Sequence, residues 1–123
     1  EGNHRKESPM KYMMLITGTE SDGGVDEERS TAVYQRIVEW WNGHEQAGHI
    51  VEGHQLEPSS TATTMRVQPD GGTIVNDGPF AEGKEMIGGY AVLDVADLDE
   101  ALALAASWPA PSTLEIRPIV ERG

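Results

Sequence analysis

The sequence predicts an α+β domain in which two β-α-β units flank a β-hairpin. Two segments carry apolar residues at helical spacing, and each lies between short apolar runs of the kind that form strands. Between the two units, the turn signal Asp70-Gly71-Gly72 separates two short strand-like segments. The 123 residues suit one domain. Two β-α-β units with their helices on one face of an antiparallel sheet make the ferredoxin-like arrangement.

The domain is expected to occupy residues 10–123. Residues 1–9 (EGNHRKESP) are polar and show no periodicity, so we interpret them as an expression remnant or a disordered arm. Lys11 to Thr17 (KYMMLIT) is a compact apolar run, which predicts a first, buried strand. Residues 18–25 are rich in turn formers and predict a loop.

A long amphipathic helix is predicted from about residue 26 to 47. Three acidic residues, 26–28, favour the positive end of a helix dipole, and Gly48 stands where a left-handed cap is expected. The apolar face is a single stripe at 3.6-residue spacing. Its members are Val33, Ile37, Trp40, Trp41 and His44. Because Trp40 and Trp41 are adjacent, one should enter the core and the other should line a dimer seam or a pocket mouth.

The middle of the chain predicts one strand and then a hairpin. Residues 50–56 read as a second strand, although a glycine interrupts them. Residues 63–67 alternate apolar and polar side chains, as in a half-buried strand, and residues 73–75 form the return strand. Residues 76–85 (NDGPFAEGKE) predict an irregular loop.

The second β-α-β unit begins with a strand at residues 87–93, where Gly88-Gly89 indicates a bulge or a close backbone approach. Asp97 with Glu100 three residues later forms a capping-box pattern for a second helix. Its apolar stripe is predicted to be Leu98, Ala101, Leu102 and Ala105. The last strand is expected at residues 114–120, with Glu115 and Arg117 on one face.

Composition excludes several classes of function. With 21 acidic and 9 basic residues, the net charge of −12 argues against binding nucleic acid or an anionic membrane surface. The absence of cysteine excludes disulfides and thiolate metal sites, and it favours a reducing, cytoplasmic setting. No apolar run approaches the roughly 20 residues that span a bilayer.

A homodimer is expected from the predicted sheet. Helices cover only one of its faces, and Met13 and Leu15 place apolar side chains on the other. Two sheets paired face to face, or closed into a shared barrel, would cover this surface.

Several motifs resemble the DGPF branch of the YCII-related family. They are residues 10–16, 77–85 (DGPFAEGKE), 88–90, 99–101 and 115–118. The resemblance covers about residues 10 to 120 and implies a ferredoxin-like fold that dimerises into an α+β barrel. It also implies a polar pocket between sheet and helices, with an acidic residue as the candidate catalytic group. A few relatives act on small ring-derived acids by elimination or isomerisation, and some are encoded beside extracytoplasmic-function sigma factors. Relatives usually carry Thr where this chain has Gly83, so a hydroxyl contact there is absent.

Asp77 is the leading candidate for a catalytic carboxylate. It shares one loop with Lys84 and Glu85, beside the Gly-Gly strand. A partly buried carboxylate serves as a general base or acid, and a nearby lysine stabilises an enolate or a carboxylate. The alternative is that Asp77-Gly78-Pro79 is only turn chemistry, with Gly78 at positive φ. We interpret Phe80 as a packing anchor rather than a stacking surface for a ligand.

Four further residues are candidates for the same site. Arg66 and Arg117 lie on predicted strands facing away from the core, where each would bind a substrate carboxylate or instead form a salt bridge, for example Arg117 with Glu115. His54 is the second acid–base candidate, to be paired with Asp77. Tyr90 would donate to a bound anion, unless it is a core residue with its hydroxyl at the rim.

Neither a metal nor a cofactor is expected. His44, His49 and His54 are spaced by five residues, which does not place them on one helix face. No phosphate-binding glycine loop and no Ser or Cys nucleophile motif occurs in the sequence.

Three functions remain open. The first is a cofactor-free lyase or isomerase acting on a small organic acid, with Asp77 or His54 moving the proton and Lys84 or Arg66 holding the carboxylate. The second is a non-catalytic protein that senses a small molecule or docks a regulatory protein partner of sigma-factor-type transcription control. In the third, the DGPF loop is purely structural.

Overall fold

A computed structural model describes residues 10–19, 27–80 and 85–121. The predicted N-terminal arm, most of the predicted loop 18–25 and Lys84 lie outside these ranges. The elements in chain order are β1 (Met10–Thr19), α2 (Glu27–Gln46), β2 (Ile50–Gln55), the 3-10 turn η1 (Ser59–Thr61), β3 (Thr63–Val67), β4 (Thr73–Asp77), β5 (Glu85–Val95), α3 (Leu98–Ala106) and β6 (Thr113–Pro118).

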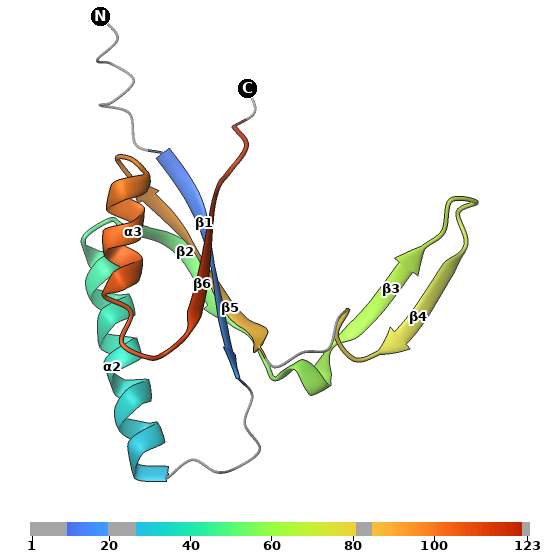
Figure 1. The fold of residues 1–123 in the computed structure, drawn as a ribbon, viewed down its shortest axis with the longest axis horizontal. Coiled ribbons are helices and arrows are strands. Elements are labelled where there is room, and N and C mark those ends of the chain that lie inside the picture. The colour runs from blue at the N-terminus through green and yellow to red at the C-terminus, as the bar shows by residue number, and fades with distance from the viewer. Residues whose placement is uncertain (1–9, 20–26, 81–84, 122–123) are drawn as a thin grey trace, which may run out of the picture.

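The main sheet has four strands in the order β2-β5-β1-β6, and every neighbouring pair is antiparallel. Both helices lie on one side of this sheet (Figure 1). The predicted ferredoxin-like α+β fold is therefore confirmed. The strands β3 and β4 form a separate two-stranded sheet that extends away on the other side (Figure 1).

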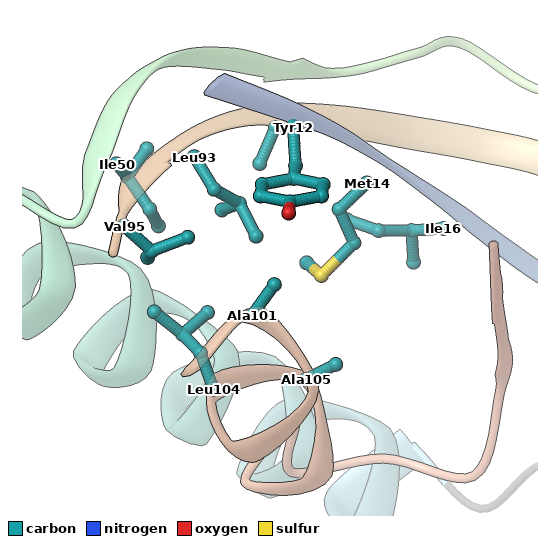
Figure 2. Close-up of a cluster of buried hydrophobic side chains, with 10 residues drawn as sticks. Tyr12, Met14, Ile16, Ile50, Leu93, Val95, Ala101, Leu104 and Ala105 are labelled. Atoms are coloured by element: carbon teal, nitrogen blue, oxygen red, sulfur yellow. The ribbon is translucent and has the colours of Figure 1, made fainter. Parts of the chain in front are cut away.

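The hydrophobic core lies between the central strands and α3. Alternate residues of β1 and β5 point toward α3, whose Ala101, Leu104 and Ala105 meet them (Figure 2). Met14 and Leu93 are the largest fully buried side chains of the described residues. The strand partners of this core are Tyr12, Met14, Ile16, Ala91, Leu93 and Val95, with Ile50 from β2.

Helix α3 begins with a variant of the predicted capping box, in which Glu100 reaches back to the amide of the residue before Asp97. The carboxylate of Asp97 accepts a hydrogen bond from the Glu100 amide at 2.9 Å, and the Glu100 carboxylate accepts one from the Ala96 amide at 2.6 Å. The predicted stripe needs a correction: Leu98 and Leu102 are about half exposed, and Leu104 takes their place in the core. With Ala101 and Ala105, it forms the i, i+3, i+4 face that meets the sheet.

Helix α2 lies less tightly on the sheet. The five residues of its predicted stripe are all partly buried, but none of them is fully buried. The helix ends at Gly48, which has φ +86° as predicted. The His49 amide bonds to the His44 carbonyl at 2.9 Å and the Gly48 amide to the Glu45 carbonyl at 3.1 Å, which is the Schellman pattern.

Within residues 10–19, 27–80 and 85–121, no helix or strand covers the face of the sheet opposite the helices. Met13, Leu15 and Val92 stand at its centre and are only partly buried. Around them, Lys11 pairs with Asp94 at 3.9 Å and Arg117 with Glu115 at 2.6 Å. We call this surface the open face.

Candidate functional site

A cavity of about 740 Å³ lies between α2 and one end of the main sheet. This volume falls in the range of about 300–1,000 Å³ that small-molecule sites occupy. One wall is helical, because Tyr34, Ile37, Val38 and Trp41 line it at i, i+3, i+4 and i+7. Trp108, which follows α3, adds a second indole.

Glycines on the strands form the opposite wall. The cavity is lined by Gly53 of β2, by Gly88 and Gly89 of β5, and by Gly18 of β1. On β5 the helix-facing side chains shrink from Leu93 through Ala91 to nothing at Gly89. Helix α2 meanwhile carries large aromatic side chains that keep it away from the sheet. The cavity follows from this mismatch in side-chain size.

The two glycine positions on neighbouring strands also allow close packing. A Cβ at Gly53 would lie 2.5 Å from the Cζ2 atom of Trp41, so the indole rests directly on the β2 backbone. A Cβ at Gly89 would lie 3.0 Å from the His54 carbonyl oxygen. The β1–β5 register shifts at Gly88, so the predicted bulge and the predicted close approach both occur.

The described residues that line the cavity are polar in places but include no acidic or basic side chain other than His54. Thr17, Asn42, Gln55 and Ser112 contribute hydrogen-bonding groups, and the Ser112 hydroxyl accepts a bond from the Trp108 indole at 3.1 Å. Among the described residues that line the cavity there is no Asp, Glu, Lys or Arg. This is notable in a chain whose net charge is −12.

The predicted acid–base role of His54 requires its imidazole to point into the cavity, but the ring points to the other face of the sheet. It pairs with Tyr90 across the β2–β5 ladder, and the two rings lie 5.9 Å apart. Directly paired residues share one face of a sheet, and Tyr90 faces away from the helices. The imidazole therefore lies on the open face, although His54 is also one of the residues that border the cavity.

The Tyr90 hydroxyl forms a hydrogen bond with a carboxylate on the neighbouring strand. Its hydroxyl donates to the Glu52 Oε2 atom at 3.3 Å. Desolvation raises the pKa of Tyr90 above its ordinary value, and the nearby Glu52 carboxylate adds to this. His54, Tyr90 and Glu52 thus form a polar cluster at the β2 edge of the open face.

Asp77, Arg66 and Arg117, three predicted site residues that the structure describes, do not line the cavity. Asp77 ends β4 at the base of the hairpin and is exposed, and Gly78 beyond it has φ +108°, as the turn interpretation requires. Arg66 lies on β3 with its guanidinium 5.2 Å from the ring centroid of Phe80. Phe80 is 72% exposed and makes no core anchor in the single chain.

Two more of the predicted site residues, Arg117 and Glu85, lie on strands of the main sheet. The Arg117 Nε atom donates to Glu115 at 2.6 Å, the salt bridge offered above as the alternative to substrate binding. Glu85 begins β5, but its side chain, like all of Lys84, lies outside the described part of the chain.

His44 and His49 meet, although their spacing argued against it. The Schellman turn at Gly48 folds the chain back and brings their Nδ1 atoms to 3.0 Å. Burial lowers the pKa of His44, and the neighbouring His49 lowers it further. In the described ranges no group of three or more His, Asp or Glu side chains is arranged to hold a metal ion.

The sequence singles out some of the residues on each wall of the cavity but not all of them. The stripe of α2 included Ile37 and Trp41, and the Gly88-Gly89 pair was recognised as a place of close approach. Tyr34 and Val38 were missed because they flank the stripe, and Trp108 because it follows the predicted helix. One pattern in the sequence indicates the cavity: glycines stand at strand positions that face the helix, and aromatic residues stand at the helix positions opposite them.

The fold and the cavity together define a ferredoxin-like α+β domain with an aromatic-walled site between helix and sheet. The family model of the YCII-related domain matches residues 10–122, so the chain belongs to the YCII-related family. It is similar to a protein of Rhizobium meliloti (strain 1021), with 34% identity over 115 residues that cover 89% of this chain and 92% of the relative. That relative is described only as uncharacterised.

In the part of the chain that the structure describes, no helix is both long and apolar enough to cross a membrane.

Proposed function

We propose that the protein binds a small, uncharged, ring-bearing molecule in the cavity between α2 and the sheet. The carrying observation is the lining itself: a volume of about 740 Å³ with aromatic walls from Tyr34, Trp41 and Trp108. Such walls bury flat apolar groups, and the few amide and hydroxyl groups fix their orientation.

Two features favour a neutral ligand over the small organic acid that the sequence predicted. The described lining supplies no cation to pair with a carboxylate. The net charge of −12 also repels an approaching anion. Binding without turnover is the better-supported form of this function, because the described lining offers no carboxylate base.

Two fluorescent probes that differ in one charged group test the proposal. N-phenyl-1-naphthylamine is neutral, whereas 8-anilinonaphthalene-1-sulfonate carries a similar ring system with an added sulfonate. In fluorescence titrations at low salt we expect the neutral probe to bind at least about tenfold more tightly. Equal or tighter binding of the sulfonate would contradict the neutral-ligand proposal.

A pair of leucine variants locates the probe. A Cβ at Gly18, which lines the cavity, meets nothing within 4 Å, so Gly18→Leu places a side chain in the cavity without a first clash. Gly43→Leu is the matched control, since Gly43 also has open space but does not line the cavity. We expect only Gly18→Leu to abolish binding of the neutral probe. Unchanged binding by Gly18→Leu would place the probe elsewhere.

We also propose that the protein is a homodimer joined through the open face. Met13, Leu15 and Val92 supply its apolar centre, and an Oδ1 atom of Asp94 is buried there without a hydrogen-bond partner in the described chain. In sedimentation velocity, Leu15→Glu is expected to yield monomers. Leu102→Glu, an equivalent change at an exposed position of α3, is expected to leave the dimer intact.

A further inference from the structure

The β3–β4 hairpin exposes an apolar surface that no other element of the described chain covers. We call residues 63–77 the arm. In its register Met65 stands opposite Val75, and Val67 opposite Thr73, so these side chains share one face. Met65 is 58% exposed, Val75 54% and Val67 70%. These are unusual values for three neighbouring apolar residues on a short ribbon.

The arm is isolated from the body of the domain. Its two strands pack extensively only against each other, and it extends away from the main sheet (Figure 1). A single two-stranded hairpin is only marginally stable in water, because one ladder cannot bury enough apolar surface. An isolated ribbon of this kind therefore gains stability by packing on another surface.

Local hydrogen bonds nevertheless define the shape of the arm. At its tip the Gly71 amide bonds to the Gln68 carbonyl at 2.9 Å, Gly71 has φ +94°, and the Gly72 amide bonds to the Asp70 carboxylate at 2.9 Å. At its base the Gly78 amide donates to the Ala62 carbonyl at 2.7 Å, and the Thr64 hydroxyl donates to the Gly78 carbonyl at 2.7 Å. These bonds hold the two strands of the arm together at its tip and at its base.

The arm extends to the same side of the sheet as the open face (Figure 1). The helices cover one side of the sheet, and the arm extends on the other (Figure 1). A second copy seated on the open face would thus lie on the side toward which the arm reaches. Because a two-fold dimer is isologous, each copy would present its arm to the other.

Charge is compatible with a second copy as the occupant, because neither of the two surfaces carries much net charge. Two chains of net charge −12 repel each other, so they associate best through surfaces that are nearly neutral. The arm carries Arg66 against Asp70 and Asp77, a net charge of −1. The open face carries Lys11 and Arg117 against Glu52, Asp94 and Glu115, also −1. Most of the negative charge therefore lies on other surfaces.

We propose that the arm clasps a second copy of this chain, packing the face of Met65, Val67 and Val75 on the partner. The proposal rests on the dimer proposed above and adds an interface to it. It also gives Arg66 and Asp77 a place near the subunit boundary rather than in the cavity of their own chain.

A pair of valine variants tests the clasp. Val67 is 70% exposed on the arm and Val120 is 74% exposed after β6, outside both proposed surfaces. Val67→Glu and Val120→Glu make the same change at equal exposure. In sedimentation equilibrium we expect Val67→Glu to raise the dimer dissociation constant by about tenfold or more, and Val120→Glu to leave it near that of the wild type. Equal effects of the two variants would overturn the clasp.

Removal of the arm gives a second measurement. Because Ala62 and Gly78 are hydrogen-bonded to each other, residues 63–77 can be replaced by Gly-Gly without separating the ends of the body. All three tryptophans lie in the body, so near-ultraviolet circular dichroism reports whether it stays folded. We expect a folded variant with the same weakened dimer as Val67→Glu. A folded variant with wild-type affinity would contradict the clasp.

Crosslinking identifies the surface that the arm touches. The chain has no cysteine, so Val67→Cys carries the single thiol, to which a benzophenone maleimide is attached. Irradiation is expected to give a covalent dimer, and crosslinking confined to one chain would overturn the proposal.

Failure of the dimer proposal can be distinguished from failure of the clasp. A monomeric wild type defeats both, whereas a dimer broken by Leu15→Glu but not by Val67→Glu defeats the clasp alone.

Discussion

The two helices of this domain cover the same face of one sheet in opposite ways. Helix α3 approaches the strands with two alanines and Leu104, and all three are buried (Figure 2). Helix α2 approaches with indole and isoleucine side chains, and every one of them is only partly buried. Small helix residues against large strand residues fill the space under α3, whereas large helix residues against glycines leave a cavity under α2.

This difference assigns separate tasks to the two β-α-β units. The α3 side supplies the close packing that stabilises the fold, because its contacts leave few voids. The α2 side gives up part of that packing and gains a site that can admit a ligand. Variants of the two sides should therefore differ in how much stability they cost and in whether a ligand restores it.

The largest difference is expected between two alanine variants. Leu104→Ala removes a buried side chain from the α3 side and should cost about 3 kcal/mol of unfolding free energy. Ile37→Ala removes a half-buried side chain that already borders empty space, and about 1 kcal/mol is expected. Urea titrations followed by circular dichroism measure both. Equal costs would contradict the contrast between the two sides.

A pair of glycine variants should give the next largest effect. At Gly53 a Cβ would lie 2.5 Å from both the Trp41 ring and the Tyr90 carbonyl oxygen, so Gly53→Ala should cost about 2 kcal/mol and displace the indole. Gly43 stands in α2 with open space around it, and Gly43→Ala should stabilise the protein by about 0.5–1 kcal/mol. Thermal unfolding with tryptophan fluorescence measures both. If both variants were neutral, the glycine–indole contact would be unimportant.

Local signals in the sequence predicted most of the fold. The order of elements, the stripe of α2, the left-handed cap at Gly48 and the capping box at Asp97 all depend on neighbours within about one helical turn. Each was confirmed at the predicted residues. The stripe of α3 was misread because Leu102 and Leu104 are equally apolar, and only the position of the sheet decides between them.

The candidate site was harder to predict, since it depends on which segments meet in space. Asp77 was favoured because several reactive residues share its loop, yet it ends an exposed hairpin strand that does not border the cavity. His54 was placed correctly on a strand, but the register of β2 against β5 turns its ring toward Tyr90. The meeting of His44 with His49 arises from a reversal at Gly48 that helical spacing does not contain.

A smaller effect is expected at the start of α3. Asp97→Ala removes the carboxylate that accepts the Glu100 amide, which should cost about 1 kcal/mol. Asp99→Ala, two residues on, removes only a favourable charge near the positive helix end and should cost no more than about 0.5 kcal/mol. Urea midpoints at neutral pH measure both changes. A larger loss at Asp99 would show that charge, rather than the cap hydrogen bond, stabilises this end.

The smallest effect is expected at the end of α2, and it depends on pH. The Nδ1 atoms of His44 and His49 are 3.0 Å apart, so one must carry a proton and the other must offer its lone pair. In the folded protein, burial and the neighbouring imidazole lower the pKa of His44 below its ordinary value of 6.5. As the pH falls below 6.5, the unfolded chain therefore binds more protons at His44 than the folded protein does. The stability that neutral His44 contributes is therefore fully present above about pH 6.5 and is lost as the pH falls toward the folded pKa.

Comparison with His44→Gln isolates this contribution from the general effect of neutralising an acidic chain. The free energy of unfolding of the wild type minus that of His44→Gln should decrease between pH 7.5 and 5.5, measured by urea titration at each pH. His49→Gln removes the second cause of the lowered pKa but leaves burial, the larger one, so it should reduce the pH dependence without abolishing it. A wild-type advantage that stays constant with pH would show that His44 contributes by packing on Trp40, whose ring centroid is 4.7 Å away, and not by its protonation state.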